Sequence, residues 1–153
     1  MVKVLVVYDT KHGNTRLVAE NIADGLREVE GITAAISDVE KVDVENLPHF
    51  DAILMGSPNH FGGPARSIRK FIDKLGKLDM VGKWAAVFDT YLGGDFNKAV
   101  RKMEDRIGEK VPSLKLITSG LSIRVEGMKG PISEGELPKC VNFGKKIANQ
   151  LKP

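Results

Sequence analysis

The chain has 153 residues, 42% of them hydrophobic and 28% charged, which is typical of a globular domain large enough to bury a core. Its formal net charge is +3, but Lys and Arg alternate with Asp and Glu, as in residues 101–106, and this favours a solvated surface over nucleic-acid binding. No apolar run approaches the ~20 residues that cross a bilayer, which argues against membrane insertion.

Cysteine usage and the N-terminal sequence bear on location. The single cysteine, Cys140, cannot form an internal disulfide, and its place in an amphipathic segment suggests packing. The first ten residues lack the apolar stretch and small-residue cleavage site of a signal peptide. We therefore expect a cytoplasmic protein in which residues 1–153 form a single domain, a monomer or else a dimer.

The first half of the chain alternates apolar runs with amphipathic segments. Residues 3–8 are almost continuously apolar, which is typical of a strand buried on both faces of a sheet. Residues 14–29 have helical periodicity and precede Gly31, a helix-stop residue. Shorter apolar runs at 32–36 and 52–56 predict two more strands, joined by a polar connection.

The second half repeats the pattern. A helix ending at Gly76 precedes a strand over 84–88, then a loop over 89–95 whose last residue, Asp95, is a predicted N-cap. Residues 114–121 predict a fifth strand, interrupted at Thr118-Ser119-Gly120, which residues 122–125 extend or pair beside. Residues 133–136 have the spacing of a capping box before the last helix.

Alternation of strands and helices predicts an α/β fold: a doubly wound parallel sheet of five strands with helices on both faces. In such sheets ligands bind beyond the carboxyl ends of the strands. The Gly-rich loops that follow the first, third and fourth strands all belong to that edge. Three converging loops predict a site for one extended ligand.

The loop Thr10-Lys11-His12-Gly13-Asn14-Thr15 joins a strand to a helix and predicts an anion site. This geometry aims backbone N–H groups and the positive end of a helix dipole at one point, where an anion can bind. Two Thr hydroxyls flank the Gly-Asn pair of the loop. Gly13 allows close approach and a positive φ. A plain strand-to-helix turn capped by Asn14 or Thr10 is the alternative, and the paired hydroxyls favour phosphate.

These residues resemble the flavodoxin family, whose phosphate loop reads [ST]-x-[ST]-G-N-T. Thr10, Gly13, Asn14 and Thr15 are in register, with His12 in place of a hydroxyl residue. Gly56-Ser57-Pro58-Asn59-His60 is similar to the second flavin loop, particularly of flavodiiron-type domains, and residues 90–94 match the third. The length is similar to that of short-chain flavodoxins, and the resemblance implies the strand order 2-1-3-4-5.

The resemblance implies FMN as the cofactor and a set of binding residues on the three loops. His60, Phe61 and Tyr91 would cover the flavin ring, and Asp89 and Asp95 are the acids that would influence its potential. The implied cofactor-binding residues are Thr10, Lys11, His12, Gly13, Asn14, Thr15, Ser57, Pro58, Asn59, His60, Phe61, Gly62, Thr90, Tyr91, Gly93, Gly94 and Asp95.

The resemblance implies an electron carrier between redox partner proteins, with no organic substrate. The alternative is an FMN-dependent NAD(P)H:quinone or porphyrinogen oxidoreductase, since residues 59–62 are similar to a loop of flavodoxin-like quinone reductases. A third hypothesis is a flavodoxin-like protein that no longer binds flavin, and the intact phosphate loop argues against it. The three histidines have no metal-binding spacing, and neither a G-x-G-x-x-G nor a Walker A motif is present.

Overall fold

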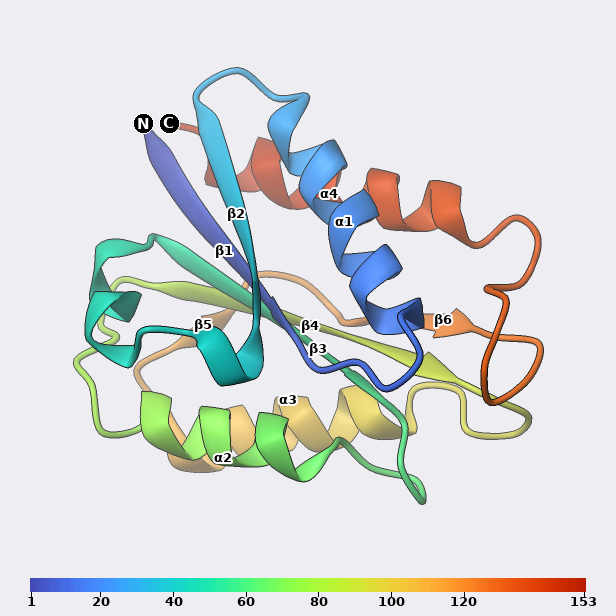
Figure 1. Ribbon diagram of the computed structural model, residues 1–153. Coiled ribbons are helices and arrows are strands. Elements are labelled where there is room, and N and C mark those ends of the chain that lie inside the picture. Colours follow the sequence, from blue (N-terminus) through green and yellow to red (C-terminus); the bar gives the residue numbers. More distant parts are fainter.

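A single parallel sheet in the order β2-β1-β3-β4-β5 forms the centre of the computed structural model, which describes residues 1–153 (Figure 1). Its first four strands are β1 (Val2–Tyr8), β2 (Ile32–Asp38), β3 (Ala52–Pro58) and β4 (Trp84–Tyr91). Every pair of neighbouring strands is parallel. The predicted fold class and strand order are confirmed.

The fifth position of the sheet is divided between two short strands. β5 (Lys115–Leu116) pairs with the start of β4, and β6 (Leu121–Arg124) pairs with its end, from Phe88↔Leu121 to Tyr91↔Arg124. The break falls at the predicted interruption. Because β6 supplies hydrogen-bond partners, β4 continues to Tyr91, and the prediction that residues 89–91 are loop is wrong.

Two helices cover each face of the sheet (Figure 1). α1 (Asn14–Arg27) and α4 (Leu137–Leu151) pack on one face, and α2 (Arg66–Leu75) and α3 (Lys98–Lys110) on the other, each pair over its own apolar cluster. Two short 3₁₀ helices, η1 (Val39–Lys41) and η2 (Val44–His49), lie between β2 and β3. No helix is both long and apolar enough to cross a membrane.

The contact between α1 and α4 depends on two glycines. A Cβ at Gly25 would stand 2.0 Å from the carbonyl oxygen of Val141, and one at Gly144 would stand 2.1 Å from that of Ile22. Any side chain at either position would force the helices apart. This close packing fixes α1, and with it the loop that precedes the helix.

The start of α3 is held by side chains from the sheet. Asn97, at φ 62°, precedes the helix, so the prediction of Asp95 as N-cap is wrong. Instead, the buried Asp89 carboxylate accepts the Val100 N–H at 3.0 Å. The Ser122 hydroxyl donates to Asp89 at 2.5 Å and accepts the Asn97 N–H at 2.9 Å. Capping therefore comes from β4 and β6, which a local pattern does not reveal.

The predicted capping box before α4 is also wrong. Glu136 precedes the helix without a side-chain cap, and Ser133 Oγ is buried without a hydrogen-bond partner. The Glu136 carboxylate instead accepts the backbone N–H of Arg124 at 3.0 Å and pairs with Lys139. Tertiary contacts with β6 take precedence over the local motif.

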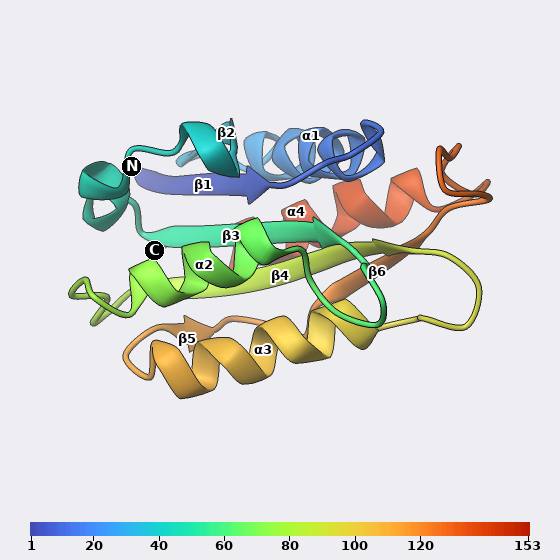
Figure 2. The same ribbon diagram turned by 60° about the horizontal axis from the view of Figure 1, so that its bottom comes forward.

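The loops that follow β1, β3 and β4 emerge at the same end of the sheet (Figure 2). This is the carboxyl edge, where the sequence places the ligand.

Candidate functional site

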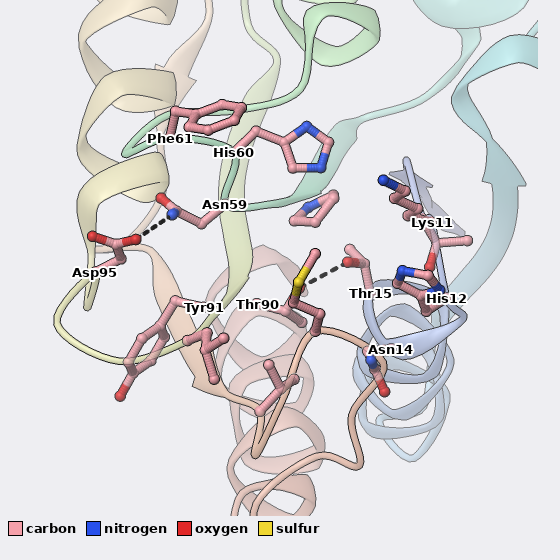
Figure 3. A pocket seen from close by; sticks show the side chains of 15 residues that line it. Lys11, His12, Asn14, Thr15, Asn59, His60, Phe61, Thr90, Tyr91 and Asp95 are labelled. Carbon is pink, nitrogen blue, oxygen red and sulfur yellow. Dashed lines mark hydrogen bonds between the residues drawn. The ribbon is translucent and has the colours of Figure 1, made fainter.

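A cavity of about 500 Å³ opens at the carboxyl edge of the sheet, a volume within the usual range for small-molecule sites. Figure 3 shows its side chains arranged around an open centre. The wall comes from the loops after β1, β3 and β4 and from the segment that follows β6. Its lining residues are Thr10, Lys11, His12, Asn14, Thr15, Pro58, Asn59, His60, Phe61, Thr90, Tyr91, Leu92, Asp95, Val125 and Met128.

One end of the cavity is formed by the loop before α1. Gly13, at φ 92°, is the N-cap of the helix, and its N–H donates to Thr10 Oγ1 at 2.9 Å. The first intrahelical bond runs from the Leu17 N–H to the Gly13 carbonyl, so the N–H groups of residues 14–16 have no partner in the protein. These free donors, together with the helix dipole, suit a phosphate.

Two hydroxyls join this loop to the third loop region. Thr15 Oγ1 and Thr90 Oγ1 lie 3.0 Å apart, and both residues are buried (Figure 3). Each hydroxyl retains bonding capacity beyond the shared bond, because a hydroxyl can donate once and accept twice. The pair holds the first turn of α1 in register with the end of β4.

The opposite end of the cavity is formed by a tight hairpin, residues 60–63. The N–H of His60 donates to the Gly63 carbonyl at 2.7 Å, and the Gly63 N–H donates to the His60 carbonyl at 3.0 Å. Phe61 and Gly62, at φ 50° and 79°, form the two-residue turn. The Asn59 N–H donates to the Thr90 carbonyl, so the Asn59 and His60 N–H groups are both occupied within the protein.

Asn59 lines the cavity, and its side chain is turned toward Asp95. Its side-chain nitrogen donates to Asp95 at 2.8 Å, and Asp95 also pairs with Lys98 at 3.0 Å (Figure 3). The Asn59 Oδ1 atom is buried and has no hydrogen-bond partner. A buried acceptor without a partner costs stability, so the Asn59–Asp95 contact is made at some cost to the free energy of folding.

The third loop, residues 92–97, forms the side of the cavity below Asn59. Tyr91 contacts Phe96 edge to face, with ring centroids 5.5 Å apart. No hydrogen bond within the protein uses the N–H groups of residues 93–95, which leaves them free for a ligand. This loop therefore combines aromatic cover with backbone donors.

The fourth wall was missed by sequence reasoning. Val125 and Met128 follow β6, in a segment closed by the Glu126 N–H to Pro131 carbonyl bond. Gly130 lies against Asn14, since a Cβ there would meet Asn14 Oδ1 at 2.6 Å. The segment carries no Gly-rich phosphate pattern, and only the pairing of β6 with β4 brings it to the site.

The structure brings most of the predicted binding residues to the cavity wall, with five exceptions. Gly13, Gly62, Gly93 and Gly94 shape the loops without lining the cavity. Ser57 is fully buried, and its hydroxyl accepts the Ala65 N–H at 2.8 Å and donates to the Pro58 carbonyl. It thus supports the second loop from behind.

The two acids considered for tuning a flavin occupy different environments. Asp95 lines the cavity, whereas Asp89 is directed at the start of α3. Burial raises the pKa of Asp89 to about 6, against the opposing effect of the hydrogen bonds from Ser122 and Val100. Asp89 therefore anchors the protein rather than facing the ligand.

Comparison with known proteins gives a consistent result. The family model described as "Flavodoxin domain" matches residues 5–118. The chain is 37% identical to a flavodoxin of Aquifex aeolicus (strain VF5), over 97% of this chain and 86% of the relative. It is 31% identical to an NAD(P)H dehydrogenase (quinone) of Trichlorobacter lovleyi, over 58% of this chain and 57% of the relative.

Among solved structures, a flavodoxin from the domain Archaea is similar to this chain, with a TM-score of 0.85. The match covers 99% of this chain and 100% of the archaeal chain at 24% identity. The shared fold thus extends from one end of the chain to the other.

Proposed function

The chain belongs to the flavodoxin family, and we propose that it binds FMN in the cavity at the carboxyl edge and carries electrons between redox partner proteins. Free backbone donors and aromatic side chains meet in one cavity, and this combination supports FMN binding most directly. The N–H groups of residues 14–16 stand at one end, and Tyr91 and His60 line the other walls.

The residues of the cavity fit FMN in chemistry as well as in size. The phosphate would lie at the first turn of α1, with N–H groups and the hydroxyls of Thr10 and Thr15 as donors. The ring would lie between the 59–61 and 91–95 segments. Ring oxygens would accept hydrogen bonds from the N–H groups of residues 93–95.

Bound FMN supplies reversible transfer of one or two electrons. The chain's own contribution is to bind, orient and partly cover the ring. Leu92, Val125 and Met128 would cover one side of the ring, and Asp95 would lie near it with a negative charge that Lys98 partly offsets. The Asn59–Asp95–Lys98 linkage fixes that charge in position.

The proposed partners are proteins, because the exposed loops offer apolar and charged contact surface around the ring. A cytoplasmic location is also proposed, since the one cysteine, Cys140, is buried and free, as expected in a reducing compartment.

The first experiment is to measure flavin in the purified protein. We expect a yellow protein with one FMN per chain, identified by absorbance and by mass after heat release. A colourless protein that fails to bind added FMN would exclude both electron transfer and flavin catalysis.

The alternative is an FMN-dependent NAD(P)H:quinone or porphyrinogen oxidoreductase. The match to a relative named NAD(P)H dehydrogenase (quinone) favours it, although the match spans little more than half of each chain. Steady consumption of NADPH with a soluble quinone, in the absence of any partner protein, would favour this enzyme. An electron carrier should show negligible turnover under those conditions.

A further inference from the structure

The hairpin 60–63 presents an aromatic side chain to solvent at the edge of the cavity. Phe61 is fully exposed and sits in a left-handed conformation, which is rare and unfavourable for a bulky residue. Two mutual hydrogen bonds between His60 and Gly63 hold this turn in place. An unfavourable backbone conformation therefore keeps exposed an apolar group that no other part of the chain covers.

The hairpin is flanked by cations from α2 and α3. Lys102 lies against it, with Cδ 3.3 Å and Nζ 3.7 Å from the position of a Cβ at Gly63, and Lys98 Cδ lies 3.8 Å from one at Gly62. Arg66 and Arg69, from the start of α2, line the same hollow. Lys102, Arg66 and Arg69 form no salt bridge within the protein.

This hollow, of about 630 Å³, adjoins the candidate FMN cavity, because His60 and Phe61 line both. Positive and negative side chains lie at different ends of this hollow. Asp105 and Glu109 lie one and two turns further along α3, away from the hairpin, and Arg106 is paired with Asp73 at 2.7 Å. The cations without partners are thus concentrated beside Phe61.

Further apolar groups stand on the neighbouring loops. Leu92, Phe96 and Met128 are exposed large side chains of the third loop and of the segment after β6. In Figure 3, Phe61 lies on the side of the cavity away from Lys11 and His12. The apolar and basic face is therefore separate from the end assigned to the phosphate.

We propose that the hairpin 60–63, with Lys102, Arg66 and Arg69 around it, is the docking surface for an acidic redox protein. Carboxylates of the partner meet the three cations, and an apolar depression in the partner accepts Phe61. The proposal rests on the proposed function, since docking here brings the partner's redox centre beside the ring. Charge complementarity speeds association and selects the partner, whereas the buried aromatic supplies affinity.

Other occupants fit the surface less well. A second copy of this chain would bring like charges together in a symmetric contact. Binding of a nucleic acid needs a longer basic surface, and Asp105 and Glu109 interrupt the basic surface along α3.

The test uses two probes that share a haem but differ in charge: native cytochrome c, which is basic, and fully succinylated cytochrome c, which is acidic. The FMN-loaded protein is reduced with dithionite and mixed with either ferric probe. Each encounter moves one electron from the flavin to one haem, which becomes ferrous. We expect the acidic probe to react about tenfold faster at low salt and to slow as salt rises. An equal or faster reaction of the native probe would overturn the proposal.

The double variant Arg69→Glu/Lys102→Glu should remove most of that advantage. Its matched control is Lys115→Glu/Lys146→Glu, which changes net charge equally at exposed positions on β5 and α4. We expect the control to retain at least half of the wild-type rate constant. Equal losses in the two variants would mean that only net charge matters, which would overturn the assigned surface.

A binding measurement separates failure of this surface from failure of the proposed function. Redox-inactive zinc-substituted succinylated cytochrome c is titrated into ¹⁵N-labelled protein. Amide shifts should cluster on residues 60–63 and on the first turns of α2 and α3. Shifts confined to α1 and α4 would overturn the proposal, even if the protein binds FMN and reduces haem.

Two further outcomes count against an acidic protein partner. A twelve-nucleotide single-stranded DNA that shifts the same amides with equal or higher affinity would reassign the surface to nucleic acid. A dimer in sedimentation experiments that Phe61→Asn dissociates would reassign the surface to a second copy of the chain.

Discussion

Both ends of the cavity are formed by short loops, but the two loops differ in which groups they leave free. At the α1 end, residues 14–16 leave backbone N–H groups without partners, and the side chains around them are mostly polar. At the hairpin end, the N–H groups of Asn59, His60 and Gly63 are all satisfied within the protein, while Phe61 is fully exposed.

This difference shows what each end can bind. Unsatisfied donors at a helix N-terminus recognise a small anion, because the free N–H groups and the positive end of the helix dipole complement its negative charge. A self-satisfied hairpin has little left to offer a polar ligand, and its exposed aromatic group gains most from burial against another protein. The α1 end therefore suits the phosphate of the cofactor, and the tip of the hairpin, beside the ring, suits a protein partner.

The largest expected effect is at the α1 end. Thr10→Asp keeps an acceptor for the Gly13 N–H but adds a negative charge beside the phosphate. We expect the dissociation constant for FMN to rise about 100-fold, with little change for riboflavin, which has no phosphate. Repulsion between two negative charges a few ångströms apart amounts to several kcal/mol at intermediate dielectric. Thr10→Asn, which is neutral and has the same shape, is the control. Equal weakening of FMN and riboflavin binding would contradict the phosphate assignment.

The next effect concerns the anchor of α3, whose lysines flank the hairpin. The pKa of Asp89, raised to about 6 in the folded state, lies above its ordinary value of 3.8. The native state therefore binds the proton more tightly than the unfolded state. This stabilisation is complete below the unfolded pKa and is lost as pH rises through about 6.

Asp89→Asn should remove this pH dependence. An amide can accept the Val100 N–H and donate to the Ser122 hydroxyl, so the variant should fold. The free energy of unfolding of the wild type, relative to the variant, should fall by about 2 kcal/mol between pH 4 and pH 7. Urea denaturation at both pH values measures it. Parallel pH profiles would contradict the raised pKa.

A smaller effect tests the link between the first turn of α1 and the end of β4. Thr15→Val and Thr90→Val each leave a buried hydroxyl without its partner, at a cost of about 1–2 kcal/mol. The double variant should cost less than the sum of the two, because no unpaired hydroxyl remains. A strictly additive double-mutant cycle in chemical denaturation would show that the hydroxyls do not interact.

The smallest expected effect is at the tip of the hairpin. Asn tolerates the left-handed conformation better than Phe does, so Phe61→Asn should stabilise the protein by roughly 0.5 kcal/mol while weakening partner docking. Thermal melts and the cytochrome assay measure the two effects. A destabilised variant would indicate that Phe61 packs on the protein in solution.

The order and type of the elements could be predicted from sequence, because buried strands and amphipathic helices have distinct periods. Their ends could not. The extension of β4 to Tyr91 depends on β6, and the start of α3 depends on Asp89 and Ser122, which lie far from the helix in sequence. Asp95, the local candidate cap, bonds to Asn59 instead.

The candidate site likewise has parts that local sequence determines and parts that depend on contacts between distant residues. The Gly-Asn-Thr loop follows local rules of turn and helix geometry, so an anion site there could be predicted from the sequence. Val125 and Met128 carry no such signal, because they reach the cavity only through the pairing of β6 with β4. The tight hairpin at Phe61 was hidden as well, since a bulky residue is an unusual choice for a left-handed turn.

A titration of flavin-free protein with FMN and with riboflavin tests whether FMN binds with its phosphate at the first turn of α1. One FMN should bind per chain, about 100-fold more tightly than riboflavin, because charge-assisted hydrogen bonds to the phosphate form at that end. Equal affinity for the two flavins, or no binding of either, would contradict it.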